Sequence, residues 1–375
     1  MKITAAVLDA LGAAAPYATS RPLRLAELDL APPGPGELLL RIDAAGVCHS
    51  DLSVVNGDRV RPLPMALGHE AAATVLAAGS GDSDFAPGDR VVLAFLPACG
   101  RCVRCASGEG YLCAVAAAAN GRGDLIGGGS RLSEDGTGVR HHLGVSAFAG
   151  HAVVDERSAV KVDADVPPEI AALFGCAVLT GVGAVVNAAA VRPGESVAVW
   201  GLGGVGLAAV LGALAAGAQP VVAIDPVAAK RDIATAAGAR AVHPDDAAAA
   251  LAALPGGGPD VAVETVGRAA VLAEAYRTAR RGGRIVTVGL PNPAEMLAIP
   301  AVSLVADGKA LIGSYMGNAI PRRDIPRYVA LWRAGRLPVE VLLTATRPLA
   351  EINAALDDLA SGAAVRQVMI PPEPR

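Results

Sequence analysis

Residues 196–225 constrain the fold of this 375-residue chain more than any other stretch. The stretch opens with the apolar run 197–200, passes through Gly201-Leu-Gly-Gly-Val-Gly206, continues as an Ala- and Leu-rich run, and closes on 221–224 followed by Asp225. This pattern predicts a strand, a tight turn, a helix, a second strand and then an acid. That arrangement is a βαβ unit.

The glycines of the turn have separate expected roles. Gly201 permits a turn that a Cβ would block, Gly203 lets backbone approach a pyrophosphate, and Gly206 lets the helix lie close on the sheet. The helix starts near Gly204 and Val205, where free N–H groups and positive partial charge face phosphates. The stretch therefore predicts dinucleotide binding.

Asp225 predicts which dinucleotide is bound. It follows the glycines by about twenty residues, where a carboxylate can accept hydrogen bonds from both ribose hydroxyls. A 2′-phosphate would meet a like charge there, at a cost of about 1 to 4 kcal/mol. NAD is therefore favoured over NADP. The uncharged run 196–224 is also long enough to span a bilayer, but its glycines and proline favour a buried βαβ unit. A βαβ unit that binds nothing is the other alternative.

Length, composition and charge narrow the class of protein. The length predicts two or three domains, and 53% hydrophobic against 18% charged residues predicts a compact globular chain. A net charge of -4 without a basic run argues against nucleic acid as a partner. Asp9 interrupts the apolar N-terminus, which we interpret as the first strand of a cytoplasmic protein with no membrane segment.

Two patterns divide the chain. Residues 1–177 are punctuated by Gly and Pro and contain short strand candidates at 38–42, 72–76 and 90–93, which predicts a β-rich domain. From 178 to 315, strands and helices alternate, which predicts a doubly wound parallel sheet. We expect residues 316–375, with helices at 325–334 and 350–360, to return to the first domain.

Four of the six cysteines lie within residues 99–113: Cys99, Cys102, Cys105 and Cys113. Four thiolates can enclose one Zn²⁺ tetrahedrally and staple a loop that has little core of its own. Redox thiols are the alternative, but a redox motif needs only one CxxC. A closed four-thiolate site has no open coordination position, so this zinc is expected to be structural.

The other two cysteines stand alone. Cys48 lies in Gly46-Val-Cys-His-Ser-Asp51, and Gly68-His69-Glu70 follows in the same domain, so thiolate, imidazole and carboxylate occur together. Cys176 lies at the expected end of a helical pattern that starts at Pro167. Residues 114–150 look loop-like, and we interpret His141, His142 and His151 as structural or surface residues, because no spacing links them to other ligands.

These motifs together resemble the zinc-dependent, medium-chain alcohol dehydrogenases over nearly the full chain, and all six cysteines fall on family zinc positions. The resemblance implies an α/β protein with a Rossmann sheet inserted in a β-rich, GroES-like catalytic domain. It implies a catalytic zinc held by Cys48, His69 and Cys176, with an open fourth position, and a structural zinc in the four-cysteine loop. Glu70 would lie behind the metal and Asp51 would orient His69.

The implied activity is hydride transfer from a zinc-bound alkoxide to NAD. Ser50 matches the hydroxyl that takes the alcohol proton into a relay through the ribose. In many relatives a histidine ends this relay, whereas this chain has Ser53, so we expect proton release to take another route.

The resemblance also assigns cofactor contacts and a substrate channel. Expected cofactor contacts beyond the glycine turn and Asp225 are His49, Thr180, Lys230 and Arg366. Matching channel positions are Phe95, Leu112, His142, Leu290 and Tyr315. The channel is expected to be apolar and to accept a small-molecule alcohol or aldehyde. The segment between Cys113 and Cys176 is long, as in dimeric relatives, which favours a homodimer. The strand near 310–312 is the expected place where two subunits join.

Two other functions stay open. One is a thiol-dependent formaldehyde dehydrogenase or nitrosothiol reductase. Asp58 and Arg59 keep this alternative open, although the run after Cys113 lacks the arginine that such enzymes have there. The other is a non-catalytic, zinc-stapled NAD-binding module, which would have no need of Cys48, His69 and Cys176 with Ser50 beside them.

Overall fold

The computed structural model describes residues 1–372 and divides into two compact units. The first contains Met1–Cys176, Ile320–Pro326 and the chain from Leu343, and the second contains Ala177–Ala319 and Arg327–Leu342. Residues 316–319 and 327–342 thus lie with the sheet unit, whereas the sequence pattern placed all of 316–375 in the first. The cause is local: the short helix Val339–Leu342 contacts α7 (Gly204–Ala215), and Arg336 Nη2 donates to the Ala215 carbonyl at 2.9 Å.

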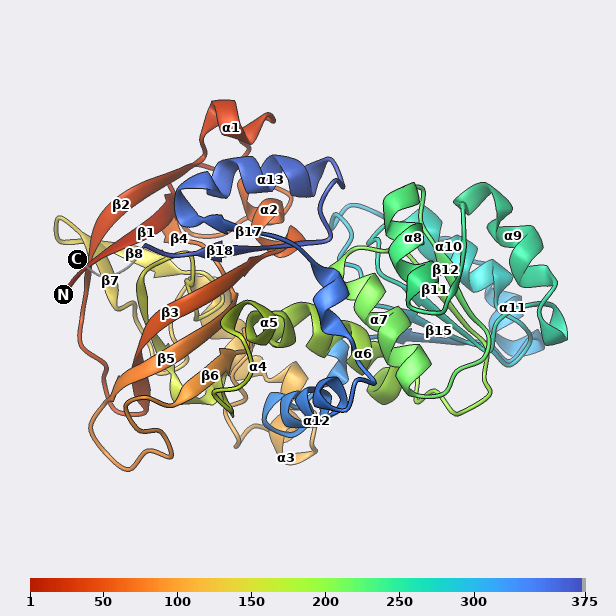
Figure 1. The fold of residues 1–375 in the computed structure, drawn as a ribbon, viewed down its shortest axis with the longest axis horizontal. Helices are drawn as coiled ribbons and strands as arrows, with labels where there is room; N and C mark the ends of the chain where they lie inside the picture. Colours follow the sequence, from red (N-terminus) through yellow and green to blue (C-terminus); the bar gives the residue numbers. More distant parts are fainter. Residues whose placement is uncertain (373–375) are drawn as a thin grey trace. The chain divides into compact units, whose positions relative to one another are not determined.

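The first unit is built from two β-structures (Figure 1). A closed barrel has the strand order β1 (Lys2–Leu8), β2 (Leu23–Leu30), β7 (Leu132–Glu134), β8 (Thr137–His141) and β4 (Met65–Ala66). A sheet has the order β10 (Ala159–Val162), β6 (Arg90–Leu93), β5 (Glu70–Ala78), β3 (Glu37–Val47), β18 (Arg366–Ile370) and β17 (Leu343–Pro348), with β9 (His151–Asp155) also paired to β3. The expected β-rich domain is confirmed.

Apolar residues from these strands form the cores that hold the site in place. β3 alternates buried and exposed side chains along its middle and is buried throughout its last four residues, Ala44–Val47. One core joins β3 and β5 to α13 (Ile352–Ala360), so the C-terminal helix closes over the strand that leads to Cys48. Burial of a Leu or Ile side chain here contributes about 1.5 to 3 kcal/mol.

Residues 114–150 are not a loop, contrary to the sequence interpretation. They contain α4 (Ala114–Arg122) as well as β7 and β8. The helix forms because alanine favours helix and because Cys113 Sγ accepts the Ala116 N–H at 3.5 Å as an N-cap. It ends at Gly123, which has a φ of 69°.

The second unit is a six-stranded parallel sheet. Its strand order is β13 (Arg240–Val242), β12 (Val221–Ile224), β11 (Val197–Trp200), β14 (Val261–Glu264), β15 (Arg284–Thr287) and β16 (Ala310–Gly313). Helices α7, α8 (Ala228–Ala236), α9 (Pro244–Ala252) and α10 (Ala269–Thr278) pack on these strands. The order reverses between β11 and β14, and ligands of such sheets bind beyond the carboxyl ends of the strands at this point. The predicted doubly wound sheet is confirmed.

The helix that starts at Pro168 runs further than its sequence pattern indicated. It comprises α5 (Pro168–Leu173), a π-helical turn (Phe174–Val178), α6 (Leu179–Gly183) and a second π-helical turn (Ala184–Ala188). Cys176 therefore lies inside a helical run and not at its end. The run 168–188 is long and apolar enough to cross a membrane, but 89% of its most apolar window is buried inside the protein, as in a core helix.

Candidate metal centre and cofactor loop

Four buried side chains converge at one point of the first unit. Cys48 follows β3 and N-caps α2 (His49–Val55), His69 and Glu70 stand at the start of β5, and Cys176 comes from the π-helical turn. One ligand atom from each lies within 4.8 Å of the others. Nε2 of His69 is buried there and has no hydrogen-bond partner among residues 1–372. Two thiols, an imidazole and a carboxylate fit Zn²⁺.

Cys176 reaches this cluster because its turn lies very close to β6. A Cβ on the preceding residue, Gly175, would stand 2.3 Å from the Leu93 carbonyl oxygen. Only glycine can occupy that position without a backbone shift. The π-helical turn adds one residue to the helical winding, and such turns occur frequently at functional sites.

The two thiols of the cluster have opposite electrostatic environments. A hydrogen bond from Cys176, together with the Arg366 guanidinium and His69, holds the pKa of the Cys48 thiol well below its usual value. The same hydrogen bond to Cys48, added to burial, raises the pKa of Cys176 well above its usual value. The surroundings thus favour one thiolate. A second thiolate needs a further positive charge, which a divalent cation supplies.

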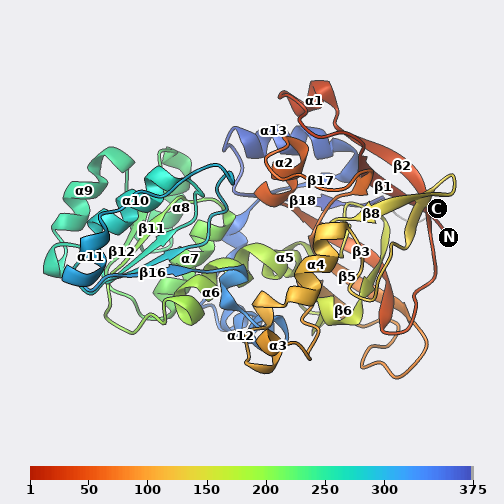
Figure 2. The same cartoon turned by 180° about the vertical axis from the view of Figure 1, so that it is seen from behind.

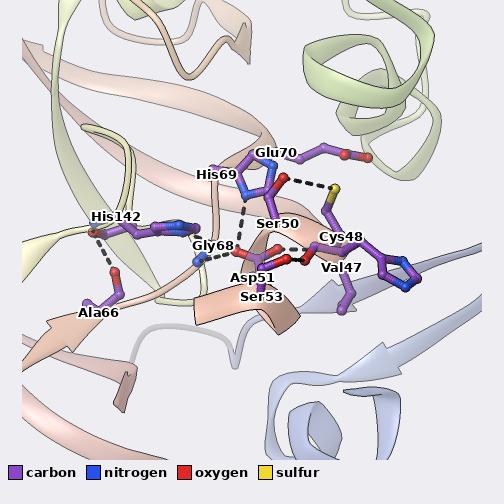
Figure 3. A network of polar contacts seen from close by, with 12 residues as sticks. Val47, Cys48, Ser50, Asp51, Ser53, Ala66, Gly68, His69, Glu70 and His142 are labelled. Carbon is purple, nitrogen blue, oxygen red and sulfur yellow. Dashed lines mark hydrogen bonds and ion pairs between the residues drawn. The ribbon is translucent and has the colours of Figure 1, made fainter. Parts of the chain in front are cut away.

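Asp51 holds two of these elements together (Figure 3). Its Oδ2 accepts the Cys48 N–H at 3.1 Å, and its Oδ1 lies 3.1 Å from Nδ1 of His69 and accepts the Gly68 N–H at 3.3 Å. Burial opposes its ionisation, but the charge of His69 and bonds from histidine hold the pKa of Asp51 at about 2. The carboxylate therefore fixes the ring of His69 with Nε2 toward the cluster.

Glu70 and Arg366 form a buried pair next to the thiols. Arg366 Nη2 lies 3.5 Å from Glu70 Oε2, and Nη1 donates to the Val47 carbonyl at 2.9 Å. Burial raises the pKa of Glu70 to about 7 against the opposing charge of Arg366. The sequence assigned Arg366 to a cofactor phosphate, and this assignment stays a prediction. In the structure the side chain is 3% exposed and faces Glu70.

The two serines of the expected proton relay have different surroundings. Ser50 Oγ lies 3.9 Å from Cys48 Sγ, beside the cluster. Ser53 Oγ donates to the carbonyl of His49 at 2.7 Å, one turn back in the same helix. The Ser53 hydroxyl is thus engaged with backbone, and the His49 side chain is exposed.

The four-cysteine loop forms a second cluster of candidate metal ligands. Sγ of Cys102 lies 3.5 Å from that of Cys105 and 4.0 Å from that of Cys113, and Sγ of Cys99 lies 3.9 Å from that of Cys105. All four thiols lie within 4.8 Å of one another, and all six cysteines are free of disulfides. Backbone N–H groups hold the pKa of Cys99 near 6, which favours its thiolate. Four thiols at these spacings fit a closed tetrahedral zinc.

The glycine turn of the second unit has the geometry that its sequence predicts. Gly201 has a φ of 86°, α7 starts at Gly204, and a Cβ on Gly206 would stand 1.8 Å from the Gly201 carbonyl oxygen. A Cβ on Gly203 would meet no atom within 4 Å, so the helix N-terminus faces open space. Asp225 Oδ2 accepts the Leu202 N–H at 2.7 Å, which ties the acid to the turn.

Comparison with known proteins decides the family. Residues 34–164 match the alcohol dehydrogenase GroES-like domain, and residues 204–333 match the zinc-binding dehydrogenase domain. The chain belongs to the zinc-dependent alcohol dehydrogenases. It is 37% identical to an NDMA-dependent alcohol dehydrogenase of Amycolatopsis methanolica, covering 99% of both chains. It is 36% identical to an S-(hydroxymethyl)glutathione dehydrogenase of Synechocystis, covering 95% of this chain and 98% of the other.

Solved structures agree with this family. The benzyl alcohol dehydrogenase of Acinetobacter calcoaceticus superposes with a TM-score of 0.92 at 31% identity, over 99% of this chain and all of that one. This dehydrogenase therefore belongs to a zinc-binding family, and the cysteine and histidine side chains of its two clusters could hold zinc.

The predicted substrate-channel residues are distributed over both units of the dehydrogenase. The Phe95 ring stands edge-on to His69, with centroids 5.6 Å apart, so an apolar ring borders the metal cluster. Leu112 is exposed in a short helix of the same unit. The other channel positions lie in the second unit, where Leu290 is exposed and Tyr315 is half-buried. The same unit contains two of the expected cofactor contacts, half-buried Lys230 and buried Thr180. Their roles stay predictions.

His142 has a contact that the sequence interpretation, a structural or surface residue with no link to other ligands, did not include. It is 1% exposed, and its Nδ1 lies 3.1 Å from Asp51 Oδ1, so it does contact the surroundings of a ligand. No spacing signal could reveal this contact, because His142 follows β8 and is far from Asp51 in the chain.

Other contacts around the cofactor loop also went unpredicted. Thr265 Oγ1 donates to the Trp200 and Gly201 carbonyls at 3.0 Å, and buried Glu264 accepts the Gly267 N–H at 2.6 Å. Arg231 Nη1 donates to the Asp225 carbonyl at 2.7 Å. Of these, only Glu264 at the end of a predicted strand left a sequence signal.

Proposed function

We propose that this dehydrogenase oxidises alcohols to aldehydes or ketones, and runs the reverse reaction, with NAD as hydride acceptor and with zinc. Cys48, His69 and Cys176 would hold the catalytic zinc, and the four-cysteine loop would hold a structural zinc. The observation that carries the proposal is the buried cluster in which His69 Nε2 lacks a partner while Ser50 lies beside Cys48. When bound, zinc supplies Lewis-acid chemistry that lowers the pKa of a coordinated alcohol or water to about 7.

The residues of the chain have separate tasks in this proposal. Ser50 would take the proton that leaves the alcohol hydroxyl while its own hydroxyl proton passes on toward solvent, and the alcohol carbon would give its hydride to C4 of the nicotinamide. Asp51 keeps His69 in one orientation. The Phe95 ring next to His69 keeps water from the reacting carbon.

Cofactor choice rests on the second unit. Asp225 is 6% exposed at the end of β12, and its carboxylate accepts N–H groups from Leu202 and Val227. Each oxygen retains further acceptor capacity for a ribose hydroxyl. The fixed negative charge supports NAD over NADP. The roles of His49, Thr180, Lys230 and Arg366 toward the cofactor remain part of the same proposal.

A thiol-dependent formaldehyde dehydrogenase is the second candidate, supported by the 36% identical S-(hydroxymethyl)glutathione dehydrogenase. NADH formation with primary, secondary and aromatic alcohols, compared with formaldehyde plus glutathione, separates the two. We expect turnover of simple alcohols without thiol. Turnover only with the thiol adduct would replace the first candidate by the second. Because one relative is named for dependence on NDMA, a parallel arm with NDMA tests whether bound NADH needs an added oxidant.

The expected homodimer stays a prediction. β16 is the last strand of its sheet, as Figure 2 shows, and Val302 and Val305 on neighbouring α11 (Ala301–Ala306) are 73% and 86% exposed. An open strand edge beside exposed apolar residues supports pairing with a second copy. Light scattering that gave the mass of a single 37.4 kDa chain would contradict it.

A further inference from the structure

One carboxylate oxygen of Asp51 is in contact with two imidazole rings. Nδ1 of His69 and Nδ1 of His142 each lie 3.1 Å from Asp51 Oδ1, and all three side chains are at most 1% exposed. The two rings stand edge to face, with centroids 5.4 Å apart and an interplanar angle of 88° (Figure 3). The His69 contact is aligned as a hydrogen bond, whereas the His142 contact is as close but less well aligned. The carboxylate behind the metal ligand is therefore shared.

The loop that carries His142 is held in an unusual backbone shape. Leu143 and Ser146 have φ values of 53° and 54°, in the left-handed region that residues other than glycine rarely adopt. Ser146 Oγ donates to the Ala66 carbonyl at 2.8 Å and accepts the His142 N–H at 2.9 Å, which fixes the loop against β4. Such residues are strained, and the two Ser146 hydrogen bonds are among the contacts that hold the loop with His142 in place.

An imidazole ring carries a proton on at least one of its two nitrogens. With a carboxylate oxygen next to Nδ1, the favourable tautomer has its proton on Nδ1. Asp51 Oδ1 then accepts the N–H groups of Gly68 and His69 and lies 3.1 Å from the less well aligned N–H of His142. Each one takes a share of the negative charge of that oxygen.

We propose that His142 is a positioning residue that limits the charge which Asp51 passes to His69. A carboxylate behind a ligating histidine raises the basicity of the ring and fixes its orientation. A second N–H on the same oxygen reduces that donation while holding the carboxylate still. The catalytic zinc is then bound less tightly, and acts as a stronger Lewis acid, than with an unshared carboxylate. This inference rests on the proposed zinc site.

The test compares two variants of the holoenzyme. His142→Phe keeps a ring of similar size and removes the N–H, whereas His142→Asn places an amide N–H near the position of Nδ1. The measurement is the rate at which zinc passes from the catalytic site to a chromophoric chelator. We expect His142→Phe to release zinc about 3- to 10-fold more slowly than the parent and His142→Asn to release it at the parent rate. The expected effect is smaller than the 10- to 100-fold change in metal affinity that is typical when a partner of a ligating histidine is removed.

Cobalt(II) at the same site gives a second readout that does not depend on activity. Its visible spectrum should shift in His142→Phe and not in His142→Asn. Equal or faster zinc release from His142→Phe, or the same change in both variants, would overturn the inference. A parent enzyme that holds zinc only in the four-cysteine loop would overturn the proposed function as well, so the two failures are distinguishable.

Discussion

Cys176→Ser is expected to abolish alcohol oxidation while the protein stays folded. The substitution removes one of two thiols from a cluster whose ligand atoms lie within 4.8 Å of one another. Loss of an outer contact weakens metal binding about 10- to 100-fold, so loss of a direct ligand should weaken it by more than about 100-fold. Elemental analysis should show zinc falling from two ions to one per chain, with turnover lost and the circular dichroism unchanged.

Cys105→Ser is the matched control, because it removes a thiol from the other cluster. We expect it to lose the other zinc and to open residues 99–113, since that loop is held chiefly by its thiols. Arg101 and Arg104 are exposed in this loop, so trypsin should cut Cys105→Ser there faster than it cuts Cys176→Ser. A Cys176→Ser enzyme that turned over alcohol with one zinc would contradict the assignment of the catalytic site.

Asp225→Gly should shift cofactor selectivity toward NADP. The carboxylate opposes a 2′-phosphate by about 1 to 4 kcal/mol, which corresponds to roughly 5- to 1000-fold in the ratio of kcat/KM for NAD to that for NADP. The structure adds a second effect. The Leu202 and Val227 N–H groups lose their acceptor, so binding of both cofactors should weaken. The ratio of the two specificity constants isolates the charge effect.

Asp232→Asn serves as the control for cofactor choice, since Asp232 is an exposed acid on the helix that follows β12. It removes the same charge without touching the turn and should leave the ratio unchanged. An unchanged ratio in Asp225→Gly, or an equal shift in both variants, would refute the assigned role of Asp225.

The parts of the site that the sequence predicted are those encoded by local spacing. The turn at Gly201 and Gly206 appears with the expected φ and helix contact, because each requirement concerns neighbouring backbone. The four cysteines of residues 99–113 meet for the same reason. The four-cysteine cluster and the parallel sheet follow directly from such short patterns, whereas the set of Cys48, His69 and Cys176 came from the resemblance to the family.

What the sequence did not predict depends on tertiary contacts. The His142–Asp51 contact joins the residue after β8 to α2, and no sequence pattern signals it. Arg366 pairs with buried Glu70 because β18 lies antiparallel to β3, a pairing that no local pattern signals. The π-helical turn at Cys176 likewise depends on the close approach of Gly175 to Leu93.

The most direct test of the central claim is NADH formation from benzyl alcohol before and after zinc is removed and restored. A chelator at a concentration that strips the exchangeable zinc should stop NADH formation, and one equivalent of Zn²⁺ per chain should restore it. Ca²⁺ or Mg²⁺ should not, because a cluster of two thiols and an imidazole selects zinc. Undiminished turnover by protein that retains only the four-cysteine zinc would contradict the account.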